Sequence, residues 1–210
     1  DMLLNPGGSY VYNGETRQFP DIRLVWWAGG NPFHHHQDLN RLRAAFQRPE
    51  TIIVNEINWT ATARHADIVL PVAASQERTD FGGGKADNCL VPMPALVPPE
   101  GEARLEFDIY ADLAERLGDR NAFTDGMEIA AWSLKIWEDT RAAAAHQGIK
   151  LPDWESFLAG DIIHLADPAE DQVFLANYRA NPDAAPLPTP SRRIELFTDR
   201  IAGYGLRDCP

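Results

Sequence analysis

The stretch that decides the fold class runs from residue 22 to residue 54, and it begins IRLVWWAGGNP (22–32) and ends TIIV (51–54). Its first seven residues form a continuous apolar run with β-branched and aromatic members, which predicts a strand buried on both faces. GGNP (29–32) predicts a tight turn directly after that strand.

Between these two apolar runs, Leu39, Leu42 and Phe46 recur at helical spacing, while Arg41 and Arg43 face away from them. This pattern predicts an amphipathic helix over 37–47. TIIV (51–54) then predicts a second short buried strand. Strand, glycine-rich turn, helix and strand within about 33 residues make a βαβ unit, whose right-handed crossover implies a parallel sheet.

The remaining segments extend this α/β pattern. We expect a loop with at most a short hairpin over 5–21, one or two helical turns over 60–65, and a third strand over 67–72. Residues 75–101, with GGGK and VPMPALVPPEG, favour an extended loop. Helical periodicity predicts helices over 102–117, ended by Gly118, and over 127–146, ended by Gly148. Shorter helices are expected in WESFLAG (154–160) and DQVFLANYRA (171–180), and a strand in RRIELFT (192–198).

The predicted fold class is therefore α/β, a Rossmann-like three-layer domain with a mainly parallel sheet and a helical extension. We expect a Rossmann-like region over 1–120, its helical extension over 121–186, and a linker with the start of a following domain over 187–210. Asp1 stands where an initiator Met is expected, and the sequence stops directly after a well-patterned segment. We therefore expect this chain to be an internal domain of a longer protein.

Composition excludes several classes of function. Nineteen Lys and Arg against 31 Asp and Glu give a net charge of −12, which opposes general binding to nucleic acid or to an anionic membrane. Apolar runs stay well short of the roughly 20 residues that a membrane-spanning helix needs. The two cysteines, Cys89 and Cys209, form no CxxC pair, so one copy of the chain cannot supply a four-cysteine iron–sulfur or zinc site.

Two features at the strand ends suggest a ligand site. The turn Gly29–Pro32 follows the first strand, where the sheets of α/β proteins bind ligands and backbone N–H groups can receive phosphate. Glu56 follows the second strand, where an acidic residue can accept hydrogen bonds from ribose hydroxyls. The alternatives are an ordinary turn and a solvated carboxylate, and spacing alone leaves both open.

Other polar motifs have a simpler interpretation. Adjacent histidines such as His34, His35 and His36 project in different directions, so loop histidines are favoured over a metal site. GGGK (82–85) lacks the Ser or Thr of a phosphate-binding loop, and we reject that assignment. Arg78 suits either a phosphate clamp or an exposed ion pair, and Asp108 suits a solvent-facing position in the first half of a helix. No catalytic residue and no metal ligand is predicted from spacing.

Several blocks of the sequence together resemble one family. They are GGNPFHHHQDLNRL, TIIVNEINWTATARHADIVLP, SQERTD, EARLEFDIYADLAERLG and TPSRRIELF. In this order they are similar to the molybdopterin-dependent oxidoreductases of the dimethyl sulfoxide reductase type, especially the branch with biotin sulfoxide, trimethylamine N-oxide and dimethyl sulfoxide reductases. The blocks span most of residues 2–118 and resume near 187–210.

The resemblance implies an internal α/β domain of a large enzyme that carries a bis(molybdopterin guanine dinucleotide) molybdenum cofactor and reduces S-oxides or N-oxides. This domain would bind the nucleotide end of one dinucleotide and contact the remaining domains of the same enzyme. The positions that match cofactor-contacting residues of the family are Asn31, His35, Asn55, Glu56, Arg78 and Asp108. Among them, Asp108 matches an aspartate able to read guanine, since a carboxylate can accept bonds from N1 and N2.

The isolated chain is expected to be inactive and to retain no cofactor, because the molybdenum ligand of the family belongs to a region absent from this sequence. The substrate, the electron donor and the oligomeric state stay open. Relatives near biotin sulfoxide reductase suggest the cytoplasm, while exported relatives in the periplasm share these motifs. Two alternatives also stay open: a free-standing module that binds NAD or another dinucleotide, and a structural domain without a ligand.

Overall fold

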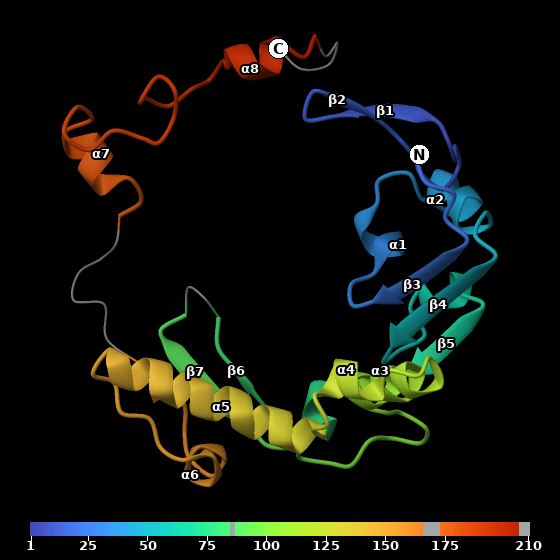
Figure 1. Cartoon of the computed structure of the whole chain (residues 1–210), viewed down its shortest axis with the longest axis vertical. Helices are drawn as coiled ribbons and strands as arrows, with labels where there is room; N and C mark the ends of the chain where they lie inside the picture. Colours follow the sequence, from blue (N-terminus) through green and yellow to red (C-terminus); the bar gives the residue numbers. More distant parts are fainter. Residues whose placement is uncertain (85–86, 166–172, 206–210) are drawn as a thin grey trace. The chain divides into compact units, whose positions relative to one another are not determined.

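The computed structural model describes residues 1–84, 87–165 and 173–205 (Figure 1). The chain divides into two compact units. The first takes in Asp1–Tyr10 and Gln18 onward to the mid-160s, and the second joins Val11–Arg17 to the described part of the C-terminal segment. Each unit is described separately below. The domain boundaries expected near 120 and 186 stay a prediction.

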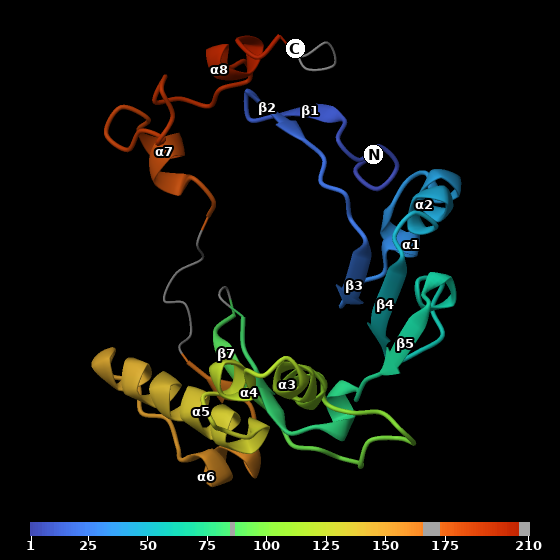
Figure 2. The ribbon, with the colours of Figure 1, turned by 45° about the vertical axis from the view of Figure 1, so that its right-hand side comes forward.

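A parallel three-stranded sheet forms the first part of unit one. It consists of β3 (Leu24–Ala28), β4 (Thr51–Glu56) and β5 (Ile68–Pro71), in the order β3-β4-β5, and the turned view of Figure 2 shows the three strands side by side. Trp26 pairs with Ile53, and Asn55 pairs with Leu70. The predicted strands and the parallel pairing are confirmed. β4 runs two residues further than expected, so Asn55 and Glu56 end the strand instead of following it.

The connections of this sheet are short helices. α1 (Pro32–His35) and α2 (Leu39–Phe46) link β3 to β4, and the 3-10 helix η1 (Ala63–His65) precedes β5. Asp38 caps α2 by accepting a hydrogen bond from the backbone N–H of Arg41 at 3.0 Å, which satisfies one of the free donors at the helix start. The expected βαβ unit is therefore present.

The core of this region is a cluster of Phe33, Phe46, Ile52 and Val54, with Trp27 packed against it. β4 supplies its fully buried residues. The prediction that the first strand is buried on both faces was wrong: Leu24 is 53% exposed, and the middle of β3 is only half-buried. β3 has one strand neighbour in this sheet, so a long apolar run here marks an edge strand and not a central one.

The segment expected to be an extended loop contains an antiparallel sheet. The 3-10 helix η2 (Ser75–Glu77) is followed by β6 (Asp80–Gly82) and β7 (Cys89–Met93), and β7 also pairs with β8 (Ile163–His164). Pro92 lacks an N–H donor, yet it fits because β8 pairs only with Cys89 and Leu90, so Pro92 has a neighbour on one side alone. Lys85 of GGGK lies outside the described residues.

Four helices complete unit one: α3 (Glu106–Arg116), α4 (Arg120–Thr124), α5 (Ile129–His146) and α6 (Trp154–Leu158). Gly118 and Gly148 follow α3 and α5 with φ of 87° and 77°, as expected for glycines that end helices. A second core cluster, Leu90, Trp137, Leu151 and Phe157, joins α5 and α6 to β7. The mixed α/β class is confirmed, and the Rossmann-like three-layer arrangement stays a prediction.

Unit two is built around the tip of a hairpin. β1 (Ser9–Tyr12) and β2 (Glu15–Gln18) are joined by Asn13 and Gly14, whose positive φ values of 52° and 83° suit a tight hairpin turn. Asn13 Oδ1 accepts hydrogen bonds from Arg200 Nη2 at 2.9 Å and from the Tyr204 hydroxyl at 3.2 Å. A Cβ atom at Gly14 would lie 2.5 Å from the Tyr204 ring, so the ring packs directly on the turn.

The C-terminal part of unit two carries α7 (Ala176–Ala180) and α8 (Asp199–Ala202). α7 lies in the predicted helical stretch 171–180, of which residues 171 and 172 fall outside the described part. The strand expected over 192–198 was wrong. Arg192 has a φ of 61°, and Leu196 is 99% exposed, so this apolar run has no sheet to join within the described unit. Across all described residues, none of the helices is long and apolar enough to cross a membrane.

Candidate functional site

A cavity of about 270 Å³ opens at the carboxyl edge of the parallel sheet. Gly29 follows β3, Asn55 and Glu56 end β4, and Val72–Ser75 follow β5. Arg78 and the start of α3, Leu105 and Glu106, close the other side. We call this the edge cavity. It lies where parallel strands of α/β proteins present their ligand sites.

Glu56 organises the loop at the mouth of the edge cavity. Its Oε1 accepts a hydrogen bond from the backbone N–H of Ile57, and its Oε2 accepts one from the Thr60 hydroxyl, both at 2.9 Å. Thr60 Oγ1 in turn accepts from the backbone N–H of Ala63 at 3.2 Å. A carboxylate offers about four lone pairs, so Glu56 keeps acceptor capacity toward the cavity.

Asn55 is the centre of a buried polar network. Its side chain, in a residue only 5% exposed, accepts from Trp26 Nε1 at 2.9 Å and donates to Glu106 Oε1 at 2.9 Å and to the Tyr110 hydroxyl at 2.8 Å. Both amide hydrogens are therefore used within the protein. The Asn55 side chain therefore ties β3, β4 and α3 together.

Arg78 reaches the edge cavity from the segment between η2 and β6. One guanidinium nitrogen, Nη2, forms an ion pair with Asp80 Oδ2 at 3.1 Å, and the side chain is 44% exposed. A guanidinium carries five N–H donors, so most of them remain for an anionic partner. Arg78 therefore forms an exposed ion pair, which is one of the two roles considered from the sequence. It also lines the edge cavity.

The other three predicted site residues do not line the edge cavity. Asn31 Oδ1 accepts a hydrogen bond from the buried Thr62 hydroxyl, His35 is exposed on α1, and Asp108 is half-buried in the first turn of α3. The structure thus brings Asn55, Glu56 and Arg78 together. It does not bring the remaining three into the same cavity wall.

Glu106 is a site residue that sequence reasoning missed. It begins α3, lines the edge cavity, and is held by Asn55 through one carboxylate oxygen. The signal in the sequence is an acidic residue in the first helical turn, which is common for structural reasons alone. Trp27 is a further residue to note, although it lines neither cavity: among the described residues its buried Nε1 has no hydrogen-bond partner, and it lies 3.8 Å from the position of a Cβ at Gly30.

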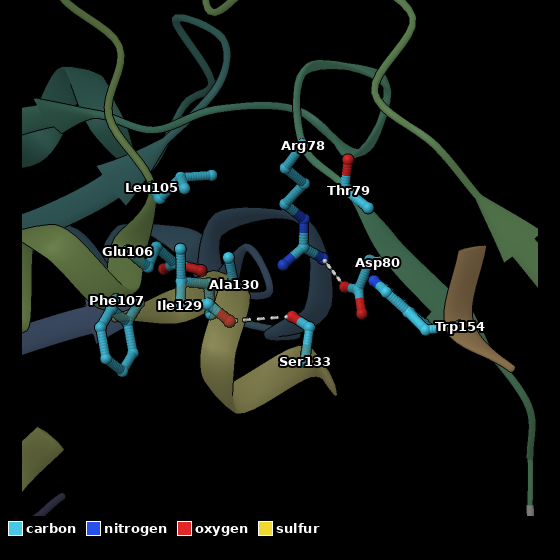
Figure 3. Close-up of a pocket in the computed structure, with 10 residues that line it drawn as sticks. All are labelled: Arg78, Thr79, Asp80, Leu105, Glu106, Phe107, Ile129, Ala130, Ser133 and Trp154. Carbon is cyan, nitrogen blue, oxygen red and sulfur yellow. Dashed lines mark hydrogen bonds and ion pairs between the residues drawn. The ribbon is translucent and has the colours of Figure 1, made fainter. Parts of the chain in front are cut away.

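A second cavity of about 300 Å³ adjoins the edge cavity, because Arg78, Leu105 and Glu106 line both. Figure 3 shows the Arg78 side chain descending between Glu106 and Asp80, with Phe107 and Trp154 on opposite sides of it. Ile129, Ala130 and Ser133 of α5 form the floor. We call this the helix cavity, since α3 and α5 supply five of its ten lining residues.

Metal binding finds no support in the arrangement of His, Cys, Asp and Glu. Within residues 1–84, 87–165 and 173–205, these side chains form no cluster of three suited to a metal ion. His34, His35 and His36 are all exposed. The chemistry available at the two cavities is that of carboxylate acceptors, guanidinium donors and backbone N–H groups.

Tyr110 adds a titratable group to the network of Asn55. Burial raises the pKa of its hydroxyl, and the charge of Glu106 raises it further, while the hydrogen bond from Asn55 lowers it. A raised folded-state pKa favours the neutral phenol. Its contribution to stability is therefore complete below the ordinary tyrosine pKa of about 10 and is lost as the pH rises through the folded-state value.

We expect the free energy of unfolding to fall more steeply with rising pH in the wild type than in Tyr110→Phe, once the pH exceeds about 10. Urea unfolding of both proteins at about pH 9 and about pH 11 measures the difference. Equal pH dependence in the two proteins would contradict a folded-state shift at this residue.

Comparisons with known proteins agree with the resemblance seen in the sequence. A family model described as molybdopterin oxidoreductase matches residues 1–116. Over its whole length the chain is 48% identical to biotin sulfoxide reductase of Cereibacter sphaeroides and 43% identical to dimethyl sulfoxide/trimethylamine N-oxide reductase of the same organism, covering 28% and 26% of these proteins. It is also 40% identical to trimethylamine-N-oxide reductase of Haemophilus influenzae, of which it covers 26%.

The chain thus spans about a quarter of the length of these curated relatives. Among solved structures it is similar to acetylene hydratase from Pelobacter acetylenicus, with a TM-score of 0.52 and 18% identity over 89% of this chain and 23% of that one. This similarity concerns the fold. The match of the family model over more than half of the chain is decisive for its membership: the chain belongs to the molybdopterin oxidoreductase family.

Proposed function

We propose that this chain holds the nucleotide end of one molybdopterin guanine dinucleotide within a larger molybdenum enzyme that reduces S-oxides or N-oxides. The names of its relatives, which are reductases of biotin sulfoxide, dimethyl sulfoxide and trimethylamine N-oxide, support the class of reaction. The single observation that carries the binding role is the edge cavity, where Glu56 and Arg78 line one space beside Gly29.

The donor and acceptor set of this cavity fits a sugar and phosphate. Glu56 offers carboxylate oxygens to ribose hydroxyls, and Arg78 offers the guanidinium N–H groups that Asp80 does not use to phosphate oxygens. Gly29 and Gly30 have φ of 77° and 72° and carry no side chain, so a ligand can approach their backbone closely.

Trp27 gives a further reason to expect a ligand at the turn after β3. Its buried Nε1–H has no hydrogen-bond partner in the described part of the chain, and an unpaired buried donor is costly, so an acceptor placed at the turn beside Gly30 would satisfy it. We propose Asn31, His35 and Asp108 as additional contacts, on the strength of the family resemblance. On the same ground we propose Asn55, whose side chain is engaged with Trp26, Glu106 and Tyr110.

In the intact enzyme the molybdenum centre supplies two-electron redox chemistry. The residues of this chain bind and orient the distant end of the cofactor, which fixes the position of its reactive end. We propose no catalytic residue in this chain, and we expect the isolated chain to lack reductase activity. Its partners would be the remaining domains of the same enzyme.

Titration of the 210-residue chain with GDP and with NAD tests the proposal. We expect GDP to bind more tightly than NAD, and Arg78→Met and Glu56→Gln each to raise the Kd for GDP about tenfold, the loss of roughly one charge-assisted hydrogen bond. Calorimetry gives the affinities.

Arg23→Met is the matched control for the arginine variant. Arg23 lies just before β3, at the opposite end of the strand from the edge cavity, and is paired with Glu50 at 2.6 Å. We expect this variant to leave the Kd for GDP unchanged. Tighter binding of NAD than of GDP, or an equal effect of the two arginine variants, would reject the proposed function.

A further inference from the structure

We infer that the free edge of β3 is a docking surface for one more parallel strand, which comes from a part of the same enzyme outside these 210 residues. This inference rests on the proposed function only in treating the chain as one portion of a longer enzyme. It gives the contact with the remaining domains a place, Leu24–Ala28, and a chemistry, which is backbone hydrogen bonding together with apolar packing.

The composition of β3 is that of a central strand. Its sequence, LVWWA, contains no charged residue and no proline, which are the usual devices that keep an edge strand from pairing with another strand. Leu24 is 53% exposed, and the middle of the strand is only half-buried. Because continuous apolar runs are typical of strands with cover on both faces, β3 has the side chains of a central strand in an edge position.

The order of the strands leaves the first one at an edge. β3, β4 and β5 follow one another along the chain and lie in the same order across the sheet (Figure 2). In doubly wound sheets three such strands form one half, in the order 3-2-1, and the second half continues from the free edge of the first strand. A parallel strand paired with β3 would make this strand central, as in that arrangement.

The opposite edge of the sheet, along β5, is protected. β5 ends in Pro71, whose carbonyl accepts a hydrogen bond from the backbone N–H of Arg104 at 3.1 Å, and Val72 forms a parallel bridge with Arg104. This edge therefore carries a proline and is covered at its carboxyl end by a segment of the same chain. Among the described residues, by contrast, β4 is the one strand paired with β3.

The length of the relatives indicates the source of the added strand. The chain covers 28% and 26% of the two reductases of Cereibacter sphaeroides, so most of their length lies outside the part that it matches. A net charge of −12 opposes the association of two copies of the chain. The occupant is therefore a segment of the same enzyme and not a second copy.

The backbone of β3 shows which amides face the free edge. The Arg23 carbonyl accepts hydrogen bonds from Glu50 and Thr51, directly before and at the start of β4. In a trans peptide the N–H of the next residue points the opposite way, so the Leu24 N–H faces away from β4. Because the direction alternates along a strand, the N–H groups of Trp26 and Ala28 face the free edge as well.

Amide hydrogen exchange compares the 210-residue chain with the intact enzyme, expressed from its complete coding sequence. In the 210-residue chain, we expect the amides of Leu24, Trp26 and Ala28 to exchange at least about tenfold faster than those of Val25 and Trp27, which face β4. In the intact enzyme the added strand should slow the first three amides at least about a hundredfold.

Two proline variants give a matched test. Leu24→Pro removes an N–H at the free edge of β3. Ile68→Pro does the same on β5, because the Asp67 N–H donates to Ile52 and the next N–H therefore faces away from β4. The two side chains are 53% and 46% exposed. Edge strands tolerate proline where the N–H faces outward, so both variants of the 210-residue chain should unfold within about 0.5 M urea of each other.

In the intact enzyme we expect Leu24→Pro to lower the melting temperature by about 5 °C or more, since it removes a hydrogen bond from the middle of a sheet. Ile68→Pro should lower it by less than about 2 °C. Loss of folded enzyme in Leu24→Pro alone, with the corresponding 210-residue variant still folded, supports the inference equally.

Three results would overturn the inference. The first is an equal effect of the two proline variants in the intact enzyme. The second is slow exchange of the Leu24, Trp26 and Ala28 amides already in the monomeric 210-residue chain. The third is an intact enzyme that is dimeric and becomes monomeric in Leu24→Pro, which would assign the edge to a second copy. GDP binding is a separate measurement: its absence rejects the proposed nucleotide site and leaves the docking edge standing.

Discussion

Replacing Trp137 by alanine is expected to lower the free energy of unfolding by about 3–5 kcal/mol, the usual cost of deleting a large aromatic side chain from a core. Trp137 is fully buried, stacks on Phe157 with ring centroids 3.9 Å apart, and meets the edge of Phe81 at 5.4 Å. Its Nε1 also donates to the backbone carbonyl of Pro152 at 3.1 Å. The side chain therefore joins α5, α6 and β6 in one cluster.

Urea unfolding followed by circular dichroism measures this loss. Trp59→Ala is the matched control, because Trp59 is 70% exposed and its removal should change the free energy of unfolding by less than about 0.5 kcal/mol. Domains have total stabilities of only about 5–15 kcal/mol, so the Trp137 variant should unfold at much lower urea. Similar midpoints for the two tryptophan variants would show that the cluster around Trp137 is not a core.

Replacing Asn55 by leucine is the second change with a large expected effect, about 3 kcal/mol of lost stability. Leucine has nearly the same size but can form no hydrogen bond, so Trp26 Nε1, the Glu106 carboxylate and the Tyr110 hydroxyl each lose a partner. Trp26 and Tyr110 are half-buried, so their polar groups left without a partner make the substitution costly, whereas the exposed Glu106 carboxylate can bind water instead.

Asn58→Leu serves as the control for this second prediction. Asn58 is exposed in the loop after β4, so the same chemical change there should shift the free energy of unfolding by less than about 0.5 kcal/mol. Chemical denaturation of the two variants gives the comparison. If Asn55→Leu proves as stable as Asn58→Leu, the network around Asn55 contributes nothing measurable.

The parallel sheet could be predicted because its signals are local. The apolar runs that became β3, β4 and β5, the turn at Gly29 and Gly30, and the periodicity of α2 all lie within short windows of sequence. The glycines that end α3 and α5 could be predicted for the same reason, because the helical pattern stops directly before each of them. A local pattern cannot tell an edge strand from a central one, which is why the exposure of Leu24 was not foreseen.

The antiparallel sheet could not be predicted, because its pairing depends on distant partners. β6 and β7 sit in a segment rich in glycine and proline, and they form where Phe81 packs against Trp137, Trp154 and Phe157. Conversely, residues 192–198 have the composition of a strand but lack such a partner among the described residues. Long-range packing thus overrode local preference in both directions.

The candidate site was predictable at the strand ends and less so on the helix. Glu56 and Arg78 meet at the edge cavity as the sequence suggested, although their role in cofactor binding stays a proposal. Glu106 and Asp108 are two positions apart, and residues at that spacing point about 200° apart around a helix. Only the packing of α3 decides which of them lines a cavity, and it is Glu106.

The contact between the Asn13–Gly14 turn and Tyr204 bears on the order of events during synthesis. The two partners are separated by about 190 residues, and closing such a loop costs on the order of 5 kcal/mol of chain entropy. The ribosome releases the hairpin first and the tyrosine far later. The turn therefore emerges without the ring that packs on it, and this small unit acquires its native contacts only after about 190 further residues have been synthesised.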